Sequence, residues 1–271
     1  MMKTIFSIHI PKTAGSFFGR FLLHGSPKVL LYNYGPVNDA SKLFLNGEEL
    51  PLDSHEERWN FFKNISSRDE KGLAVMHGHF TGSSFLNEIA HAMYIFWVRE
   101  PIDRLFSHYQ YWKRQMQFQD PSAEKNLGQK RQLFRKMNPT FEQFACSPHF
   151  SNRQSDFVRN LPLNRILNIG IFENLSSSME RFSEELELNS NVEYNNFINS
   201  SPSSSLEEMK FSDDLIKKIY QQNSEDKLGM YFRIGRRERC AAPSRASCLA
   251  CGWRSCWACM ALAPALHYDY D

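Results

Sequence analysis

Ile8-His9-Ile10-Pro11-Lys12-Thr13-Ala14-Gly15-Ser16-Phe17-Phe18 lies almost at the start of this 271-residue chain. An apolar, β-branched run over residues 4–10 precedes Pro11, and the apolar spacing after the loop is helical, with one face formed by Phe17, Phe18, Phe21 and Leu22. This order predicts a strand, a short loop and a helix. The first N–H groups of a helix are unpaired and lie at the positive end of its dipole, so the segment predicts an anion-binding loop.

The residues of the loop indicate which class of phosphate-binding loop it resembles. Ala14 and Gly15 allow close approach of the backbone to a ligand, and Lys12 adds a point charge. A Walker A loop has its lysine after a second glycine, whereas here the lysine comes first and one glycine is present. The order resembles the 5′-phosphosulfate loop of sulfotransferases, although an ordinary strand-to-helix turn fits the segment taken alone. The resemblance implies donor contacts for Lys12, Thr13, Ala14, Gly15, Ser16 and Phe17.

A second apolar run, residues 93–98, ends in Arg99, and Pro101 follows at the first position of a predicted helix. Arg99 at the strand tip and Ser107 two turns along the helix can reach one phosphate with a guanidinium and a hydroxyl donor. The alternative is that Arg99 pairs with Glu100 or a helix end. Arg-x-Pro-x-x-Arg-x-x-Ser resembles the 3′-phosphate motif of sulfotransferases, which implies donor contacts for Arg99 and Ser107. A later Asn-Ser-Ser-Pro loop resembles a further donor loop and implies a contact for Ser201.

The third motif is His77-Gly78-His79, at the end of a predicted strand over residues 73–77. A lone histidine is usually structural, and two at i and i+2 point the same way unless Gly78 breaks the strand. No third ligand stands at a metal-like spacing, so we expect no metal site. The pair resembles His-Gly-His of the heparan sulfate and uronyl 2-O-sulfotransferases. This implies catalytic roles for His77 and His79, with His79 the better candidate for the general base.

Together the motifs imply sulfuryl transfer from 3′-phosphoadenosine 5′-phosphosulfate to an acceptor hydroxyl, with a carbohydrate favoured and other hydroxyl compounds left open. In this interpretation His79 takes the hydroxyl proton, and Lys12 stabilises the charge that develops on the leaving oxygen. The reaction requires no metal. A P-loop-type nucleotide kinase is one alternative, but it would need Mg²⁺ ligands. The other is a non-catalytic nucleotide or glycan binder, which could dispense with Lys12 or His79.

Alternation of strands and helices predicts a three-layer, P-loop-like α/β fold with a mainly parallel sheet flanked by helices. The strands are expected near residues 4–10, 73–77, 93–98 and 166–172, with the motifs at their carboxyl ends, where such sheets bind ligands. Asn174 is expected to cap the helix that follows the last strand. The basic segment 118–138 is interpreted as a solvated surface or as a lid over an anionic acceptor. Asn152 and Gln154 resemble a segment that lines the acceptor side in relatives.

We expect residues 1–235 to form the sulfotransferase domain and residues 236–271 to be an atypical tail outside the fold. The tail lacks Lys, Asn, Ile, Phe, Val, Thr and Gln, and it is rich in Ala, Arg and Cys. It forms two CxxC pairs, and the spacer between them is shorter than in the usual zinc modules. The tail holds five of the six cysteines: Cys240, Cys248, Cys251, Cys256 and Cys259.

Lysine and arginine number 32 and aspartate and glutamate 30, so charge is nearly balanced, and we expect no nucleic-acid partner. The sequence contains no apolar span of about 20 residues, the length of a transmembrane helix. Met1-Met2-Lys3 leads straight into the first strand without the pattern of a signal peptide. These features predict a cytoplasmic enzyme, with the Golgi lumen as the alternative if an anchor precedes the chain. The oligomeric state is left open.

Overall fold

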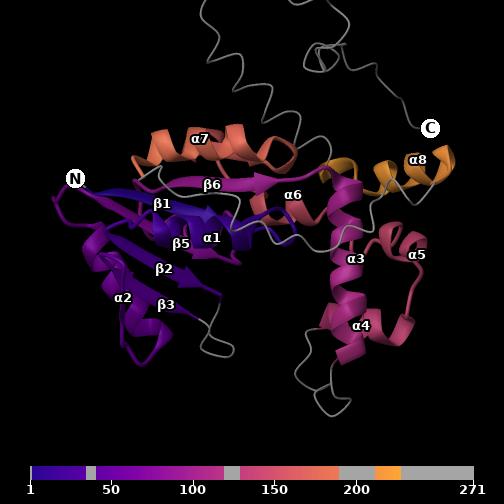
Figure 1. The fold of residues 1–271 in the computed structure, drawn as a ribbon, viewed down its shortest axis with the longest axis horizontal. Coiled ribbons are helices and arrows are strands. Elements are labelled where there is room, and N and C mark those ends of the chain that lie inside the picture. Colours follow the sequence, from indigo (N-terminus) through magenta and orange to yellow (C-terminus); the bar gives the residue numbers. More distant parts are fainter. Residues whose placement is uncertain (1, 35–40, 119–128, 189–210, 227–271) are drawn as a thin grey trace, which may run out of the picture.

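A seven-stranded sheet forms the centre of the computed structural model, which describes residues 2–34, 41–118, 129–188 and 211–226 (Figure 1). The strand order is β4-β3-β2-β5-β1-β6-β7. Neighbours from β2 to β7 run parallel, and β3 and β4 add an antiparallel hairpin at one edge. The strands are β1 (Lys3–Ile8), β2 (Val29–Asn33), β3 (Lys42–Leu45), β4 (Glu48–Leu50), β5 (Leu73–Gly78), β6 (Met93–Val98) and β7 (Ile166–Ile171).

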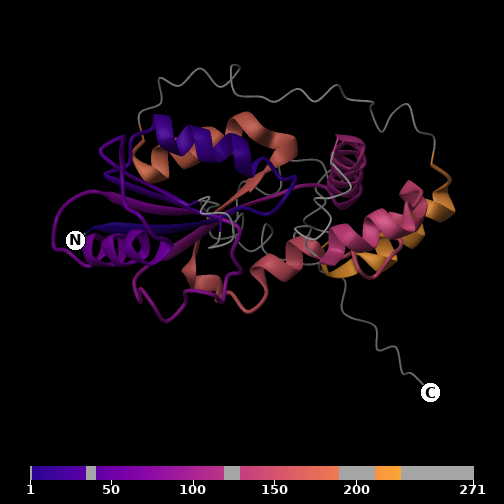
Figure 2. The same cartoon turned by 90° about the horizontal axis from the view of Figure 1, so that it is seen from below.

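Helices cover both faces of this sheet (Figure 2). On one face, α1 (Gly15–His24) and α7 (Leu175–Leu186) pack Phe18 and Phe182 against Trp97 of β6. On the other face, α2 (His55–Ser66) contributes Phe62, which lies against Phe6 of β1. Alternate side chains of the same strands therefore enter two separate apolar layers. This arrangement confirms the predicted α/β fold with a mostly parallel sheet flanked by helices.

A third apolar cluster lies beyond the carboxyl ends of the strands, among helices that follow β6. At its centre, aromatic side chains pack edge to face, as Trp112 does with Phe134 and Phe106 with Phe141. Figure 1 shows α3 extending past the edge of the sheet, with α4, α5 and α8 beside it. The helices are α3 (Pro101–Phe118), α4 (Gln129–Met137), α5 (Phe141–Ala145), α6 (Arg153–Val158) and α8 (Asp213–Gln222), and the 3₁₀ turns are η2 (Leu163–Arg165) and η3 (Phe172–Asn174).

The predicted strands that carry the motifs are present, with small changes at their ends. The first strand ends at Ile8, two residues earlier than expected. Asn174 lies at the N-cap position of α7 but makes no capping hydrogen bond with its side chain. Within the basic segment 118–138, α4 is helical and buries Phe134, so this part is packed on one side and solvated on the other.

Several predictions fall on residues outside the described ranges. Ser201 and the tail 236–271 are among them, so the donor contact of Ser201 and the domain boundary at residue 235 stay predictions. The described helices include none that is both long and apolar enough to cross a membrane. The cytoplasmic location also stays a prediction.

Candidate active site

The loop between β1 and α1 has an unusual backbone that exposes amide groups. Lys12 and Ala14 adopt left-handed conformations, with φ of 72° and 76°. The Thr13 hydroxyl is buried and donates to the Ile10 carbonyl oxygen at 2.9 Å, which closes the turn from inside. Ala14 is the N-cap residue of α1 and offers no side-chain acceptor to the first amides of that helix. The first amides of α1 therefore have no side-chain cap and lie at the start of a helix, a position that favours an anion.

The predicted donor contacts in this loop divide into side chains and backbone. Ser16 is exposed at the start of α1, so its hydroxyl is accessible. Phe17 and Thr13 are buried, so only their backbone groups remain for a ligand. Gly15 lies against His9, and a Cβ atom at Gly15 would be 1.8 Å from Cδ2 of that ring. Glycine is required there because the loop crosses directly over the imidazole.

One face of α3 brings further groups to the loop. The Lys12 ammonium lies 4.7 Å from the centre of the Tyr111 ring, a cation–π distance. Ser107 and Arg114 lie one turn before and one turn after Tyr111 on the same helical face, and Ser107 is half-buried. Burial lowers the pKa of Lys12, and the positive charges of Arg114 and Arg99 lower it further. The structure thus gathers Lys12, Arg99 and Arg114 into a cluster of cations.

Arg99 follows the last residue of β6, and its backbone is fixed by α6. Its N–H donates to Oε1 of Gln154 at 2.8 Å, and Nε2 of Gln154 donates to the Arg99 carbonyl at 2.9 Å. The guanidinium lies 4.1 Å from the centre of the Phe172 ring, and its Nε is buried without a hydrogen-bond partner. No carboxylate in the described part of the chain forms an ion pair with Arg99. Glu100 accepts from the Asp103 amide and from the Tyr220 hydroxyl. Burial lowers the pKa of Arg99, and the nearby carboxylates of Asp103, Glu173 and Glu100 oppose this effect without forming an ion pair.

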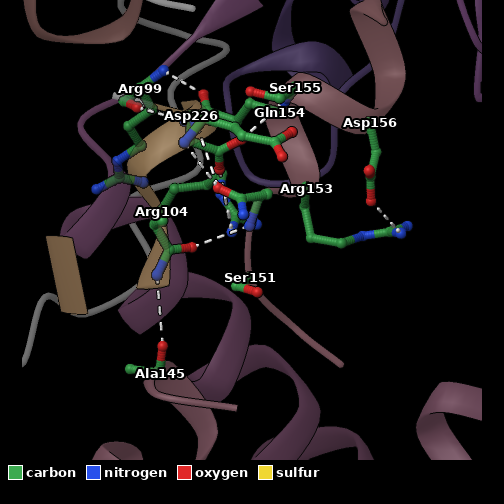
Figure 3. A network of polar contacts seen from close by, with 12 residues as sticks. Arg99, Arg104, Ala145, Ser151, Arg153, Gln154, Ser155, Asp156 and Asp226 are labelled. Atoms are coloured by element: carbon green, nitrogen blue, oxygen red, sulfur yellow. Dashed lines mark hydrogen bonds and ion pairs between the residues drawn. The ribbon is translucent and has the colours of Figure 1, made fainter. Parts of the chain in front are cut away.

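A buried polar network connects α6 to the end of α8 (Figure 3). Oδ1 of Asn152 accepts from the amides of Glu225 and Asp226 at 3.1 and 3.3 Å. Asp226 accepts from the Ser155 amide at 2.7 Å through Oδ1, and its Oδ2 lies 3.9 Å from Nη2 of Arg104. The Arg104 and Asp226 side chains are fully buried, so this pair is shielded from water. Asn152 and Gln154, expected on the acceptor side, thus have side chains engaged in supporting α8 and Arg99.

His79 lies where the end of β5 meets the end of β1. Ile8 and Gly78 are register partners, and the His9 amide donates to the Gly78 carbonyl at 2.7 Å. Nδ1 of His79 lies 2.7 Å from the His9 carbonyl oxygen. Because a carbonyl only accepts, Nδ1 carries the proton and Nε2 of the neutral ring is the accepting atom. Gly78 stays within β5, and a Cβ atom there would lie 1.7 Å from the Asn33 carbonyl oxygen.

His77 occupies a different environment from His79. It is 1% exposed, lies against Phe18 of α1, and its Nδ1 is 2.8 Å from the Ser7 hydroxyl. Burial and the neighbouring His79 lower the pKa of His77 to about 3. One side of His79 is exposed to solvent. Partial burial and the positive charge of Arg131 on α4 lower the pKa of His79, and the hydrogen bond to the His9 carbonyl acts in the opposite direction. Both rings are therefore neutral at neutral pH.

Sequence reasoning did not assign several residues that the structure places at this site. His9 and Tyr34 contact the His79 ring, at 4.2 and 5.1 Å between ring centres. The sequence predicted a strand over residues 4–10, which places His9 inside it, and only the observed end of β1 at Ile8 shows that His9 follows the strand as His79 does. Gln154 was expected on the acceptor side, and the sequence carries no signal for its contact with Arg99, which lies 55 positions away. In the described ranges, no cluster of three or more His, Cys, Asp or Glu side chains could hold a metal ion.

Mouse sulfotransferase SULT7A1, solved as a complex with PAP, is 14% identical, with a TM-score of 0.36 over 78% of this chain and 68% of the mouse chain. A sulfotransferase from Alicyclobacillus acidocaldarius is 13% identical, with a TM-score of 0.42 over 86% of this chain and 95% of the bacterial chain. A search of curated proteins returns no significant match.

The sequence model of the sulfotransferase family matches residues 2–229. This span includes the loop of Lys12, the strand end at His79, and Arg99 with its helix. It also includes α6, whose Gln154 side chain binds the backbone of Arg99, and α8. Because the match extends over most of the 271 residues, the chain belongs to the sulfotransferase family.

Proposed function

We propose that the protein transfers a sulfuryl group from 3′-phosphoadenosine 5′-phosphosulfate to a hydroxyl of a carbohydrate. The observation that carries the proposal is the meeting of two features at one end of the sheet. One is the loop of free amides with Lys12 beside Arg99 and Arg114. The other is the neutral, solvent-accessible ring of His79, with Nε2 as its accepting atom. An anionic donor and an acceptor hydroxyl need these two environments side by side.

The residues present fit the charge and shape of the donor. Amides at the start of α1, the Ser16 hydroxyl and Lys12 provide donors for the 5′-phosphosulfate. The buried Nε of Arg99 lacks a partner, and a buried unpaired guanidinium nitrogen is costly, so an anion there satisfies it. Ser107 on α3 adds a hydroxyl for the 3′-phosphate. The donor itself supplies the activated sulfuryl group.

His79 is the proposed general base. A base must be neutral and accessible, and its accepting nitrogen must not already be engaged. His79 meets these conditions because its Nδ1–H is held by the His9 carbonyl and its ring is exposed. His77 is enclosed between β1 and α1, so we propose a supporting role for it in holding the end of β5. This selects His79 from the two histidines of the motif.

Lys12 is proposed to stabilise negative charge on the oxygen that leaves with adenosine 3′,5′-bisphosphate. It is the charged side chain of the loop itself, and Tyr111 holds its ammonium from the far side. A preorganised cation in a partly dry site stabilises charge more than one in water, because the local dielectric is low. Neighbouring Arg99 and Arg114 increase the local positive potential. The carbohydrate acceptor is proposed from the His-Gly-His resemblance to the 2-O-sulfotransferases.

Isothermal titration calorimetry with adenosine 3′,5′-bisphosphate and with ATP–Mg²⁺ tests the donor. We expect binding of the bisphosphate and weak or absent binding of ATP–Mg²⁺. Preference for ATP–Mg²⁺ would contradict the proposed donor and favour a kinase. Radiolabelled sulfuryl transfer to a panel of glycans and simple alcohols then tests the acceptor class, and transfer only to non-carbohydrate hydroxyls would contradict the carbohydrate proposal.

A further inference from the structure

Three imidazole rings form one continuous stack at the ends of β1 and β5. His9 occupies the middle, with its ring centre 4.2 Å from that of His79 at an interplanar angle of 27°. On its other side His77 lies at 5.3 Å and 17°. The proposed catalytic role of His79 uses only the outer ring of this stack. The proposed reaction assigns no role to His9, although its ring contacts both His77 and His79.

His9 is fixed on every side. Its side chain is almost fully buried, with 6% of the residue exposed, and its Nδ1 lies 3.1 Å from the Tyr34 hydroxyl. The loop passes over the ring at Gly15, where a Cβ atom would overlap it. Its amide is bonded to Gly78 and its carbonyl to His79. A side chain restrained in this way can impose its own orientation on the ring stacked against it.

We infer that His9 is a positioning residue for His79, because its carbonyl sets the tautomer of His79 and its ring face sets the orientation of the imidazole. The inference rests on the proposed function, since it concerns the proposed base. In neutral imidazole only one nitrogen accepts a proton, and the ring must also point that nitrogen correctly. His9 supplies both restraints from one residue. It therefore acts through His79 and needs no contact with either substrate.

The stack also controls the charge of His79. The groups that face His79 are His9 directly after β1, His77 on β5, Tyr34 after β2 and Arg131 on α4. None of these is a carboxylate that would favour the imidazolium. Replacing the His9 ring by a methyl group lets water reach the inner face of His79. The pKa of His79 should then rise toward its ordinary value of about 6.5, and the acidic limb of kcat should move to higher pH.

The test compares His9→Ala, which removes the stacked ring, with His9→Phe, which keeps an aromatic face; both variants retain the backbone carbonyl that contacts His79. Long-range ¹H–¹⁵N spectra of ¹⁵N-histidine-labelled protein report the tautomer and the titration of His79, and His79→Gln assigns its signals. We expect the tautomer of His79 to be retained in both variants, because the carbonyl remains. The pKa of His79 should rise in His9→Ala and stay near its wild-type value in His9→Phe. His91→Ala, at an exposed histidine bonded to Thr4, is the matched control and should change neither.

Steady-state kinetics provide the second readout. We expect His9→Ala to lower kcat by about 10- to 100-fold, as misplacement of a catalytic group does, with the affinity for adenosine 3′,5′-bisphosphate retained. His9→Phe should retain most of kcat. A wild-type pKa of His79 in folded His9→Ala, or a tautomer that changes in either variant, would overturn the inference, whatever the change in melting temperature. Absence of donor binding or transfer in the wild-type protein would contradict the proposed function instead, and the spectra, which need no substrate, would still decide the role of His9.

Discussion

Gln154 binds both backbone groups of Arg99 through one side-chain amide, so two chain segments 55 positions apart are held as one unit. The carbonyl oxygen of Gln154 accepts and its NH₂ group donates, a complementary pair that a carboxylate or a hydroxyl cannot reproduce. The position of Arg99 therefore depends on α6, and α6 in turn is supported by the end of α8. The geometry of the proposed donor site therefore depends on residues such as Gln154 that act through Arg99.

Removing Arg99 or its support should weaken donor binding. Arg99→Ala removes a charge-assisted contact present before and during the reaction, so we expect the Kd for adenosine 3′,5′-bisphosphate to rise by about tenfold or more. Gln154→Ala should weaken binding in the same direction by a smaller factor, since the guanidinium remains but its backbone is loosened. Calorimetric titration measures both. Gln221→Ala, at an exposed position on α8, is the control, and equal affinity in Gln154→Ala would contradict the positioning role.

Replacing His79 should separate chemistry from binding. His79→Ala removes the proposed base, and we expect kcat to fall by about 10²–10⁴-fold while donor affinity stays near wild type. His77→Asn should lower stability because it disturbs a buried, hydrogen-bonded side chain, with a milder effect on kcat in the folded fraction. Single-turnover kinetics and calorimetry distinguish the two effects. Full turnover in His79→Ala with inactive, folded His77→Asn would move the base to His77.

Lys12 should affect binding and turnover together. Lys12→Met keeps the length of the side chain and its packing on Tyr111 but removes the charge. We expect both a weaker donor complex and a lower kcat, because the ammonium contacts the donor in the ground state and stabilises more charge in the transition state. Lys12→Arg should restore binding better than turnover, since a planar fork does not replace a point charge. A change in KM alone would contradict the role at the leaving oxygen.

Acid should destabilise the fold through buried neutral histidines. Burial lowers the pKa of His77 to about 3 and that of His108 well below its ordinary value. Below pH about 6.5 the unfolded chain binds protons at these positions and the folded chain does not, so the free energy of unfolding falls by up to about 1.4 kcal/mol per histidine and pH unit. Above this pH the effect vanishes. Burial raises the pKa of Glu100, which acts in the opposite direction nearer pH 4.5.

Urea unfolding at several pH values between 5.5 and 8 measures this dependence. The free energy of unfolding should rise with pH up to about 6.5 and then level off. His108→Phe removes one titrating group from an aromatic environment that includes Trp112, so its slope should be smaller than that of the wild type. An unchanged slope would show that His108 is protonated in the folded state or that its pKa in the unfolded state is low.

The sequence predicted those strands that are apolar runs followed directly by a motif. β5, β6 and β7 are such runs, and their ends lie within a residue of the predicted ones. The hairpin of β3 and β4 was not predicted, because strands of four and three residues with mixed polarity carry no clear period. The start of α2 was not predicted either, although Ser54 and Glu57 form a capping box, a pattern that the sequence contains.

The candidate site was predicted at the level of motifs and not of contacts. The sequence named Lys12, Arg99 and His79, which follow strands and therefore meet at one edge of a parallel sheet. It did not reveal that the Thr13 hydroxyl donates to the Ile10 carbonyl and closes the loop, because a hydrogen bond from a side chain to the nearby backbone leaves no pattern in the sequence. The support of Arg99 by Gln154 is a long-range contact, and periodicity carries no information about partners that distant.

The left-handed conformations of Lys12 and Ala14 bear on how fast and how selectively the loop captures an anion. A non-glycine residue with this geometry costs roughly 1–2 kcal/mol relative to ordinary backbone, and the surrounding fold bears that cost in the absence of ligand. The amides are thus arranged in advance, so association need not wait for a slow rearrangement of the chain. We expect anions of another shape to fit these amides less well. Discrimination among phosphate esters then begins at the encounter step, before any proton is transferred.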